Sequence, residues 1–272
     1  MTQSPNFASL PDRSLIAVGG PDWRSFLQGL VTQDAETLAP GEARFAALLT
    51  PQGRLLYDLF LVGRGDGVWL DVEAAHREAL LQRLTIYRLR AKVEIAADET
   101  TISALFGGSQ AAPGFLADPR LAALGWRGYG AVAPQGALTA DARAYDAHRL
   151  ALGIPGPADW GSDKTYPIEA NFDLLNGIDF KKGCFVGQET TSRMKRRGHI
   201  KTRMAPIAFE GPAPAPGAEV LAGELRAGEV LSGRDGRAMA SLRLDRALGA
   251  SLTVDGRPVT LERPSWFLEA LG

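Results

Sequence analysis

The spacing of apolar residues changes along the chain, and this change is the strongest constraint on its fold. Up to about residue 204, strand-like alternation is interspersed with segments of helical periodicity at 21–30, 73–90 and 141–152. After the proline-rich segment 211–217 (GPAPAPG), short alternating stretches are separated by glycine-containing turns. The sequence therefore predicts an α+β fold for residues 1–204. It predicts a small C-terminal antiparallel β-barrel for residues 205–272, with 211–217 as a linker.

Within the first region, several apolar stretches have the length and alternation of strands. Residues 42–50 and 54–62 flank Pro51-Gln52-Gly53, so we expect them to form a β-hairpin. Asp22 stands where it can cap the helix at 21–30. We expect 154–168, which holds three prolines and two glycines, to be a loop. The other predicted strands are 10–20, 67–72, 92–97 and 101–106.

Composition excludes several classes of protein. A net charge of −1 argues against bulk affinity for nucleic acid or an anionic membrane. One cysteine excludes an internal disulfide, and three separated histidines make a resident metal site unexpected. The N-terminus lacks the pattern of a signal peptide, and no apolar run has the length of a membrane span. We therefore expect a cytoplasmic protein, or one of the mitochondrial matrix if the source is eukaryotic.

The single cysteine, Cys184, lies in the segment KKGCFVGQET at 181–190. Lys181 and Lys182 precede it, and nearby cations lower the pKa of a thiol and make it more nucleophilic. Gly183 and Gly187 give the surrounding backbone freedom to form a loop or a helix start. The alternative is a buried cysteine that serves as a small apolar side chain.

Polar side chains on both sides of Cys184 are suited to bind a heterocycle. Gln188 and Glu189 combine an amide with a carboxylate, although the start of a helix would also explain them. Glu169, with Asn171 close by, can accept two donors from an aminopyrimidine edge. An exposed acid of no function is the alternative for Glu169.

The same region is strongly basic. Between Lys181 and Arg203 there are eight lysines and arginines and a single acid, Glu189. This imbalance favours an anionic ligand or partner, whereas a solvated surface is the alternative. RNA binding through 193–203 is a further hypothesis that rests on charge alone.

The segment KKGCFVGQE closely resembles the K-G-C-[FY]-x-G-Q-E signature of the YgfZ-type folate-binding proteins, which belong to the superfamily of the glycine-cleavage T-protein, an aminomethyltransferase. Other segments are similar to this family in the expected order. They are FLQGLVTQDA at 26–35, LLTPQGRLLYDLFLV at 48–62, GIP at 153–155, and RGHIKTRM before the predicted barrel.

The resemblance implies a GcvT-like body with a tetrahydrofolate site, followed by a β-barrel. Glu169 stands where T-protein relatives have a pterin-binding glutamate. Asp58 stands near their acidic pair, which here reads Tyr57-Asp58 and so lacks one carboxylate. This departure argues against aminomethyltransferase activity, whereas the cysteine motif belongs to the YgfZ branch.

The leading hypothesis is a folate-binding accessory protein that supports assembly or repair of iron–sulfur proteins, including tRNA-modifying ones. Its cofactor would be tetrahydrofolate or a derivative, and its partners would be iron–sulfur assembly or client proteins, with no nucleic acid or membrane. The alternative is a folate-dependent one-carbon transferase with Asp58 as general base. The predicted catalytic residues are Cys184 and Asp58, and the predicted cofactor-binding residues are Glu169, Asn171, Lys182, Gln188, Glu189 and Arg193.

Overall fold

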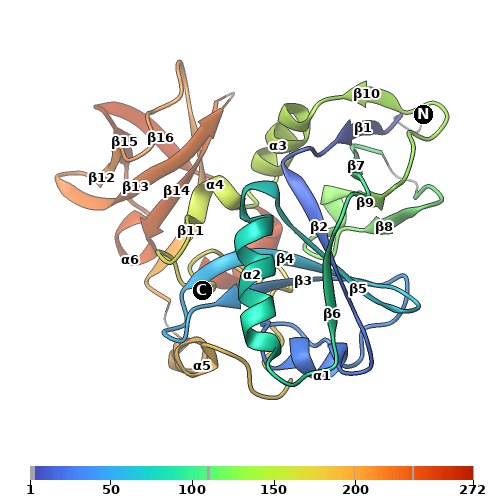
Figure 1. Ribbon diagram of the computed structural model, residues 1–272. Coiled ribbons are helices and arrows are strands. Elements are labelled where there is room, and N and C mark those ends of the chain that lie inside the picture. The colour runs from blue at the N-terminus through green and yellow to red at the C-terminus, as the bar shows by residue number, and fades with distance from the viewer. Residues whose placement is uncertain (1–3, 109–110, 199, 235, 272) are drawn as a thin grey trace.

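The computed structural model describes residues 4–108, 111–198, 200–234 and 236–271, which form two five-stranded sheets and a closed barrel (Figure 1). The first sheet is antiparallel throughout, in the order β3 (Ala43–Leu49), β4 (Leu55–Gly63), β5 (Gly67–Glu73), β2 (Arg13–Gly19) and β6 (Glu94–Asp98). The second has the order β10 (Leu138–Ala140), β1 (Asn6–Ser9), β7 (Ile102–Phe106), β9 (Trp126–Tyr129) and β8 (Phe115–Ala117). This architecture confirms the predicted α+β body with a C-terminal barrel.

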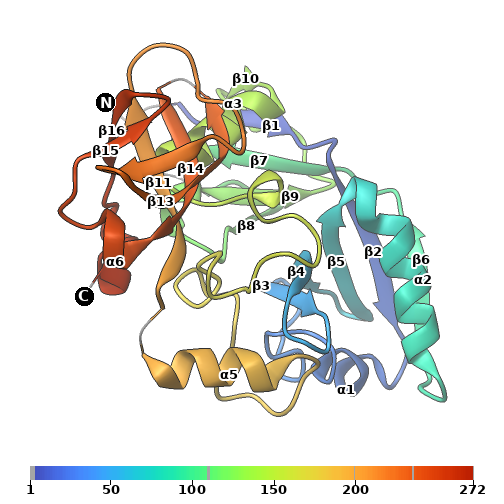
Figure 2. The same ribbon diagram turned by 90° about the vertical axis from the view of Figure 1, so that its left-hand side faces the viewer.

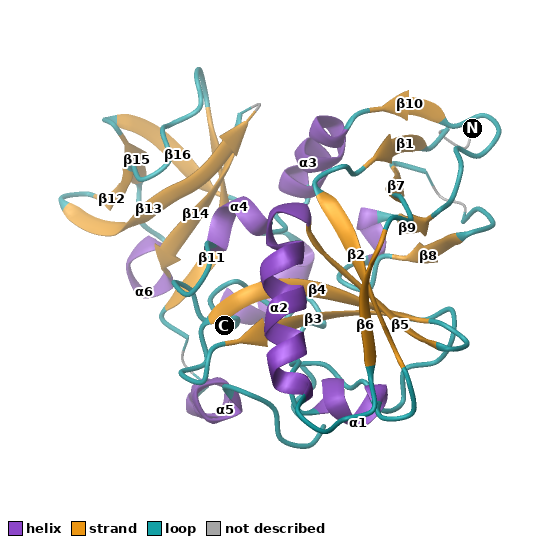
Figure 3. Cartoon of the chain, in the orientation of Figure 1, coloured by secondary structure: helices purple, strands orange, loops and turns teal. Residues whose placement is uncertain are grey.

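Helices cover the sheets and connect them to the barrel (Figure 3). The α-helices are α1 (Trp23–Gln28), α2 (Arg77–Arg88), α3 (Ala142–Ala151), α4 (Pro157–Trp160), α5 (Gln188–Arg197) and α6 (Leu244–Ala247). Single turns of 3-10 helix are η1 (Ala74–His76) and η2 (Ala122–Leu124), and a longer one is η3 (Ser265–Leu271). The short helix α4 lies within the segment predicted to be a loop. Its first residue is a proline, which is favourable at a helix start.

The β3–β4 hairpin forms as predicted and is buried on both faces. Along β4, Tyr57 and Leu59 pack toward α2, whereas Leu55 and Phe60 pack toward the barrel side. Residues of a strand point alternately to the two faces, so burial of both faces requires a nearly continuous apolar sequence. The single charged residue within β4, Asp58, is therefore conspicuous.

The barrel begins at β11, before the proline-rich segment. Its strands are β11 (Thr202–Phe209), β12 (Glu219–Ala222), β13 (Leu225–Arg234), β14 (Arg237–Arg243), β15 (Leu252–Val254) and β16 (Arg257–Leu261). Residues 211–217 connect β11 to β12 inside the barrel, so the prediction that they link two domains is wrong. The predicted boundary between 204 and 205 falls inside β11.

The one predicted helix cap, Asp22, has a different partner from the expected one, whereas Asp141 caps a helix without having been predicted to. Asp141 caps α3 by accepting a hydrogen bond from Ala144 N. Asp22 occupies the N-cap position of α1, but its carboxylate accepts from Lys92 N instead. This bond ties the start of α1 to the chain that enters β6.

A buried carboxylate, Asp71 on β5, joins the two sheets. Its oxygens accept from Arg13 Nε on β2 at 2.7 Å, and from Arg127 and Tyr129 on β9 of the other sheet. Burial alone would raise the pKa of Asp71, but Arg127 and Arg13 outweigh it and hold this pKa below its ordinary value. The carboxylate is thus charged and fully paired in the interior.

The structure predicts that Asp71→Asn destabilises the protein by about 3–5 kcal/mol, because buried Arg127 loses its ion-pair partner and Arg13 loses one of its two. The exposed Asp66, on the turn between β4 and β5, provides a control, and Asp66→Asn is expected to change stability by no more than about 0.5 kcal/mol. Urea unfolding of the three proteins measures both values. Equal midpoints for wild type and Asp71→Asn would contradict the assignment.

Candidate functional site

Cys184 is exposed and precedes α5. Figure 2 shows the loop that leads into this helix. We define residues 177–187 as the cysteine loop. Its exposed thiol excludes the alternative of a buried apolar cysteine. The following residue, Phe185, is buried in the core and fixes the chain immediately after the thiol.

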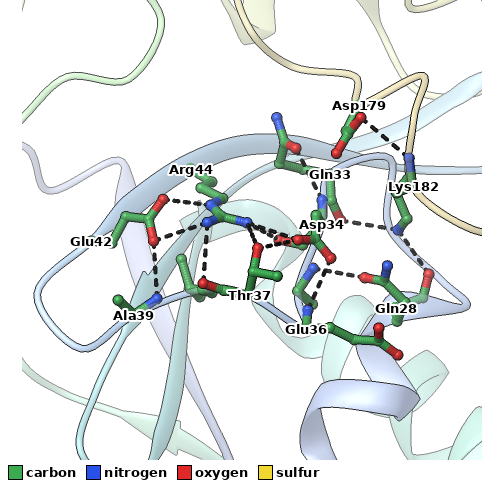
Figure 4. Close-up of polar contacts among 12 residues, drawn as sticks. Gln28, Gln33, Asp34, Glu36, Thr37, Ala39, Glu42, Arg44, Asp179 and Lys182 are labelled. Carbon is green, nitrogen blue, oxygen red and sulfur yellow. Dashed lines mark hydrogen bonds and ion pairs between the residues drawn. The ribbon is translucent and has the colours of Figure 1, made fainter.

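Lys182 anchors the cysteine loop to the segment that follows α1 (Figure 4). Its ammonium nitrogen donates to the carbonyl oxygens of Gln28, Val31 and Gln33 at 2.8, 2.6 and 3.0 Å. An ammonium group has three protons, so each has an acceptor. The structure thus gives Lys182 a role in holding the loop, which differs from the expected contact with a cofactor or with the thiol.

Backbone and hydroxyl contacts reinforce this anchor. Thr32 Oγ1 donates to Gly177 O at 2.6 Å, and Asp179 N donates to Thr32 O at 2.9 Å. Asp179 Oδ1 in turn accepts from Lys181 N and Lys182 N, which closes a tight turn before the cysteine. The FLQGLVTQDA segment therefore supports the cysteine loop along several residues.

The end of the cysteine loop packs against the turn of the β3–β4 hairpin. Gly187 has φ of +80°, and a Cβ atom there would lie 2.6 Å from Thr50 O and 2.9 Å from Gly53 Cα. A Cβ on Gly53 would in turn lie 2.9 Å from Thr190 Cβ. Only glycine permits so close an approach. The segments 26–35 and 48–62 of the family resemblance therefore both contact the cysteine loop.

Helix α5 carries the remaining predicted residues of this region, which are Gln188, Glu189 and Arg193. Its inner side packs through Thr191, which is buried, and Met194, which contacts the core. Gln188 is half-buried at the first position of the helix, whereas Glu189 and Arg193 are exposed.

Asn171 is fully buried beneath the barrel, in the left-handed conformation with φ of 63°. Its amide nitrogen donates to Met204 O at 2.7 Å, and its amide oxygen accepts from Arg203 Nη1 at 3.1 Å. These bonds join the segment before the cysteine loop to β11. This location differs from the expectation that Asn171 contacts a cofactor.

Glu169 is half-buried near the start of β4. Its carboxylate accepts from Tyr166 N at 3.1 Å. Burial raises the pKa of Glu169 above its ordinary value, and the Tyr166 amide and Arg54 offset this only in part. A partly buried carboxyl with spare acceptor capacity suits the recognition of a donor pair, and the binding role of Glu169 stays a prediction.

A cavity of about 340 Å³ lies among both sheets, α3, α4 and β13. Asp58 and Phe60 of β4 line it, and Tyr57 packs on the opposite face of the sheet. Of the predicted site residues that the structure describes, Asp58 alone is among its lining residues. The lining also contains six arginines, namely Arg13, Arg120, Arg127, Arg143, Arg149 and Arg234.

Asp58 is held in an ion pair inside this cavity. Arg13 Nη1 lies 2.7 Å from Asp58 Oδ2, and the same guanidinium also binds Asp71. The sequence analysis did not identify the arginines as site residues, because they come from distant segments without a shared motif. Among the lining residues, the sequence singled out Asp58 alone, because it stands near the acidic pair of the T-protein relatives.

The chain is similar to known proteins in both sequence and fold. Residues 201–269 match the family described as CAF17, C-terminal beta-barrel domain. The fold is shared with the crystal structure of glycine cleavage system aminomethyltransferase T from Bartonella henselae, with a TM-score of 0.79 over 97% of this chain and 86% of that one. The sequence identity to this structure is 18%, so the likeness establishes the fold alone.

The sequence is 34% identical over 262 residues to the human iron-sulfur cluster assembly factor IBA57, mitochondrial, covering 81% of this chain and 74% of the human protein. The chain belongs to the IBA57 family. The mouse IBA57 is 33% identical with the same coverage. The IBA57 homolog of Mycosarcoma maydis is 32% identical, and the chain spans only 57% of its length.

Membership in the IBA57 family confirms the family resemblance inferred from the cysteine motif, and the structural comparison confirms the GcvT-like fold. The named relatives are mitochondrial assembly factors. None of the helices in the described part of the chain combines the length and apolar character needed to span a bilayer.

Adjacent lysines of this IBA57-family chain give a matched test of the loop anchor. Lys182→Met removes three hydrogen bonds from a charged donor and is expected to cost about 2–3 kcal/mol of stability. Lys181 is exposed, and Lys181→Met should change stability by no more than about 0.5 kcal/mol. Chemical unfolding measures the difference, and equal losses for the two variants would refute the anchor.

The same variants have a predicted pH dependence. Burial lowers the pKa of Lys182 to about 8, although Asp34 and Asp179 oppose this shift. In the unfolded chain the pKa of a lysine is about 10.4. Between the folded and the unfolded pKa of Lys182, the unfolded chain therefore binds more protons than the folded protein. The free energy of unfolding of wild type should therefore rise with pH relative to that of Lys182→Met between about pH 8 and 10. A falling difference would contradict this direction.

Proposed function

We propose that the protein is an accessory factor for assembly or repair of iron–sulfur proteins, including tRNA-modifying ones, and that Cys184 is its reactive thiol. One observation carries this proposal: the single cysteine is exposed on a loop that Lys182 and Gly187 hold in place. Thiolates are both the nucleophiles of sulfur chemistry and the usual ligands of iron–sulfur clusters. The names of the IBA57 relatives support the same role.

A fixed loop with an exposed thiol suits reaction with a partner. The loop is anchored on three sides, by the segment after α1, by the hairpin turn and by the core at Phe185. A thiol positioned in this way loses little conformational entropy when a partner protein meets it. The partners are therefore iron–sulfur assembly or client proteins rather than a small molecule that must enter a pocket.

Complementation tests the role of the thiol. In a strain that lacks its own homologue, wild type should restore iron–sulfur enzyme activity, whereas Cys184→Ser should leave it at the level of the empty vector. Ser162→Ala, which changes an exposed residue on another loop, is the matched control and should rescue fully. Equal rescue by Cys184→Ser and wild type would rule out the thiol-centred function.

We further propose that tetrahydrofolate or a derivative binds as a cofactor. The arginine-lined cavity has a volume within the range of about 300–1,000 Å³ found for small-molecule sites. It combines apolar Phe60 with the carboxylate of Asp58 and guanidinium donors, which fits a ring with donor and acceptor edges and a carboxylated tail. Glu169 is the second candidate contact, because its carboxyl is partly buried and keeps free acceptor capacity.

Calorimetry with tetrahydrofolate separates these two contacts. Glu169→Gln should weaken binding about tenfold, the equivalent of roughly 1.4 kcal/mol. Glu224→Gln, an exposed change on the barrel, should bind like wild type. Loss of affinity in Asp58→Asn but not in Glu169→Gln would place the ring in the arginine-lined cavity without a contact from Glu169. Absence of binding by wild type would reject the cofactor.

The ion pair of Asp58 argues against the alternative one-carbon transferase. A general base must offer a free lone pair to the proton that it removes. Arg13 Nη1 donates to Asp58 Oδ2 at 2.7 Å and so occupies the lone pair of that oxygen. No observation on the described residues favours the transferase over the accessory role.

A further inference from the structure

The outer surface of α5, next to the cysteine loop, is strongly cationic. Figure 2 shows α5 along the lower edge of the molecule, with the cysteine loop leading into it. We define the α5 basic face by its exposed cations. These are Lys181, Arg193, Lys195, Arg196 and Arg197.

Helical geometry directs these charges away from the protein. Thr191 and Met194 define the inner side of α5, and a helix advances about 100° per residue. Arg196 therefore lies on the side opposite Thr191 and Met194, with Arg193 one turn before it. The four cations of α5 together cover roughly half of the helix circumference, with Lys195 at the edge nearest to Thr191.

Among the described residues, three of the four cations on α5 lack the counter-charges found elsewhere in the protein, whereas Lys195 Nζ lies 3.7 Å from Asp173 Oδ2. On the barrel, Arg226 and Arg243 are paired with acids at 2.9 and 2.7 Å. Among the residues that the structure describes, Arg193 and Arg196 have no ion pair, and neither does Arg197.

Stabilisation of the helix does not account for every cation of the α5 basic face. Cations in the last turn interact favourably with the helix dipole, which explains Lys195, Arg196 and Arg197. Arg193 lies in the middle of the helix and Lys181 lies outside it. The apolar ring of Phe180, 37% exposed beneath Lys195, adds an apolar edge that a solvated surface does not need.

We propose that the α5 basic face docks an acidic partner protein and so brings the partner's reacting group to Cys184. The inference rests on the proposed function, because it assigns a surface to the partner that the thiol would meet. An iron–sulfur cluster held by four thiolates is itself an anion, so the α5 basic face also favours its approach. RNA fits less well, since single-stranded binding uses several stacking aromatics and, among the described residues, Phe180 is the one exposed aromatic beside this face.

A protection assay tests the surface directly. The rate at which Cys184 reacts with the neutral disulfide dithiodipyridine is measured with and without polyglutamate at low salt. Polyglutamate should slow the reaction of wild type roughly tenfold, and high salt should abolish this protection. In the double variant Arg193→Glu/Arg196→Glu the protection should disappear when it is measured relative to the variant's own unprotected rate.

Control variants make the outcome specific. Arg88→Glu/Arg90→Glu makes the same change of net charge at the exposed end of α2 and should keep the protection. Loss of protection in this control as well would overturn the assignment to α5. Stronger protection by an oligouridylate than by polyglutamate at equal charge would also overturn it, in favour of RNA.

Complementation distinguishes this inference from the function on which it rests. The α5 double variant should fail to restore iron–sulfur enzyme activity although it folds and keeps its reactive thiol. If Cys184→Ser fails to rescue but the α5 double variant rescues like wild type, only the docking surface is refuted. If Cys184→Ser rescues, the proposed function itself is refuted.

Discussion

A single carboxylate, Asp71, determines how the two sheets meet. It is fully buried, and its oxygens bind guanidinium or phenol groups from both sheets. Burying ions is costly, and this cost is recovered only when each charge has several well-placed partners. Because Arg13 binds Asp71 and Asp58 together, the same network forms one wall of the cavity and fixes the position of the Asp58 carboxylate. The stability of the fold and the chemistry of the cavity are thus linked through one side chain.

The cysteine loop uses the same physical device with the opposite charge. A lysine ammonium, rather than a carboxylate, gathers the backbone carbonyls of a distant segment. Carbonyls outside regular structure need donors, and one cation supplies three of them. The loop therefore has a defined shape although it contains neither helix nor strand. The loop exposes the thiol to a partner, and the hydrogen bonds of Lys182 fix the position of this loop.

The sequence predicts some of these features and not others, for physical reasons. Apolar alternation identified the β3–β4 hairpin and the barrel, because burial of a strand face depends on local pattern. The role of Lys182 depends on carbonyls about 150 residues away, which no local pattern encodes. Asn171 appeared to be a ligand-binding residue, yet its amide satisfies the backbone of β11. The prolines of 211–217 suggested a linker, since proline is excluded from central strands but is equally suited to a long loop within a barrel.

The thiol and the cavity occupy separate places, and the β3–β4 hairpin is the element that they share. Its turn contacts the cysteine loop through Gly53 and Gly187, and its second strand carries Asp58 into the cavity. The hairpin is packed on both faces, so it transmits displacement as a rigid body rather than absorbing it. Any effect of a cavity ligand on Cys184 would most directly pass along this hairpin. Folate and thiol chemistry then need not share a pocket to belong to one function.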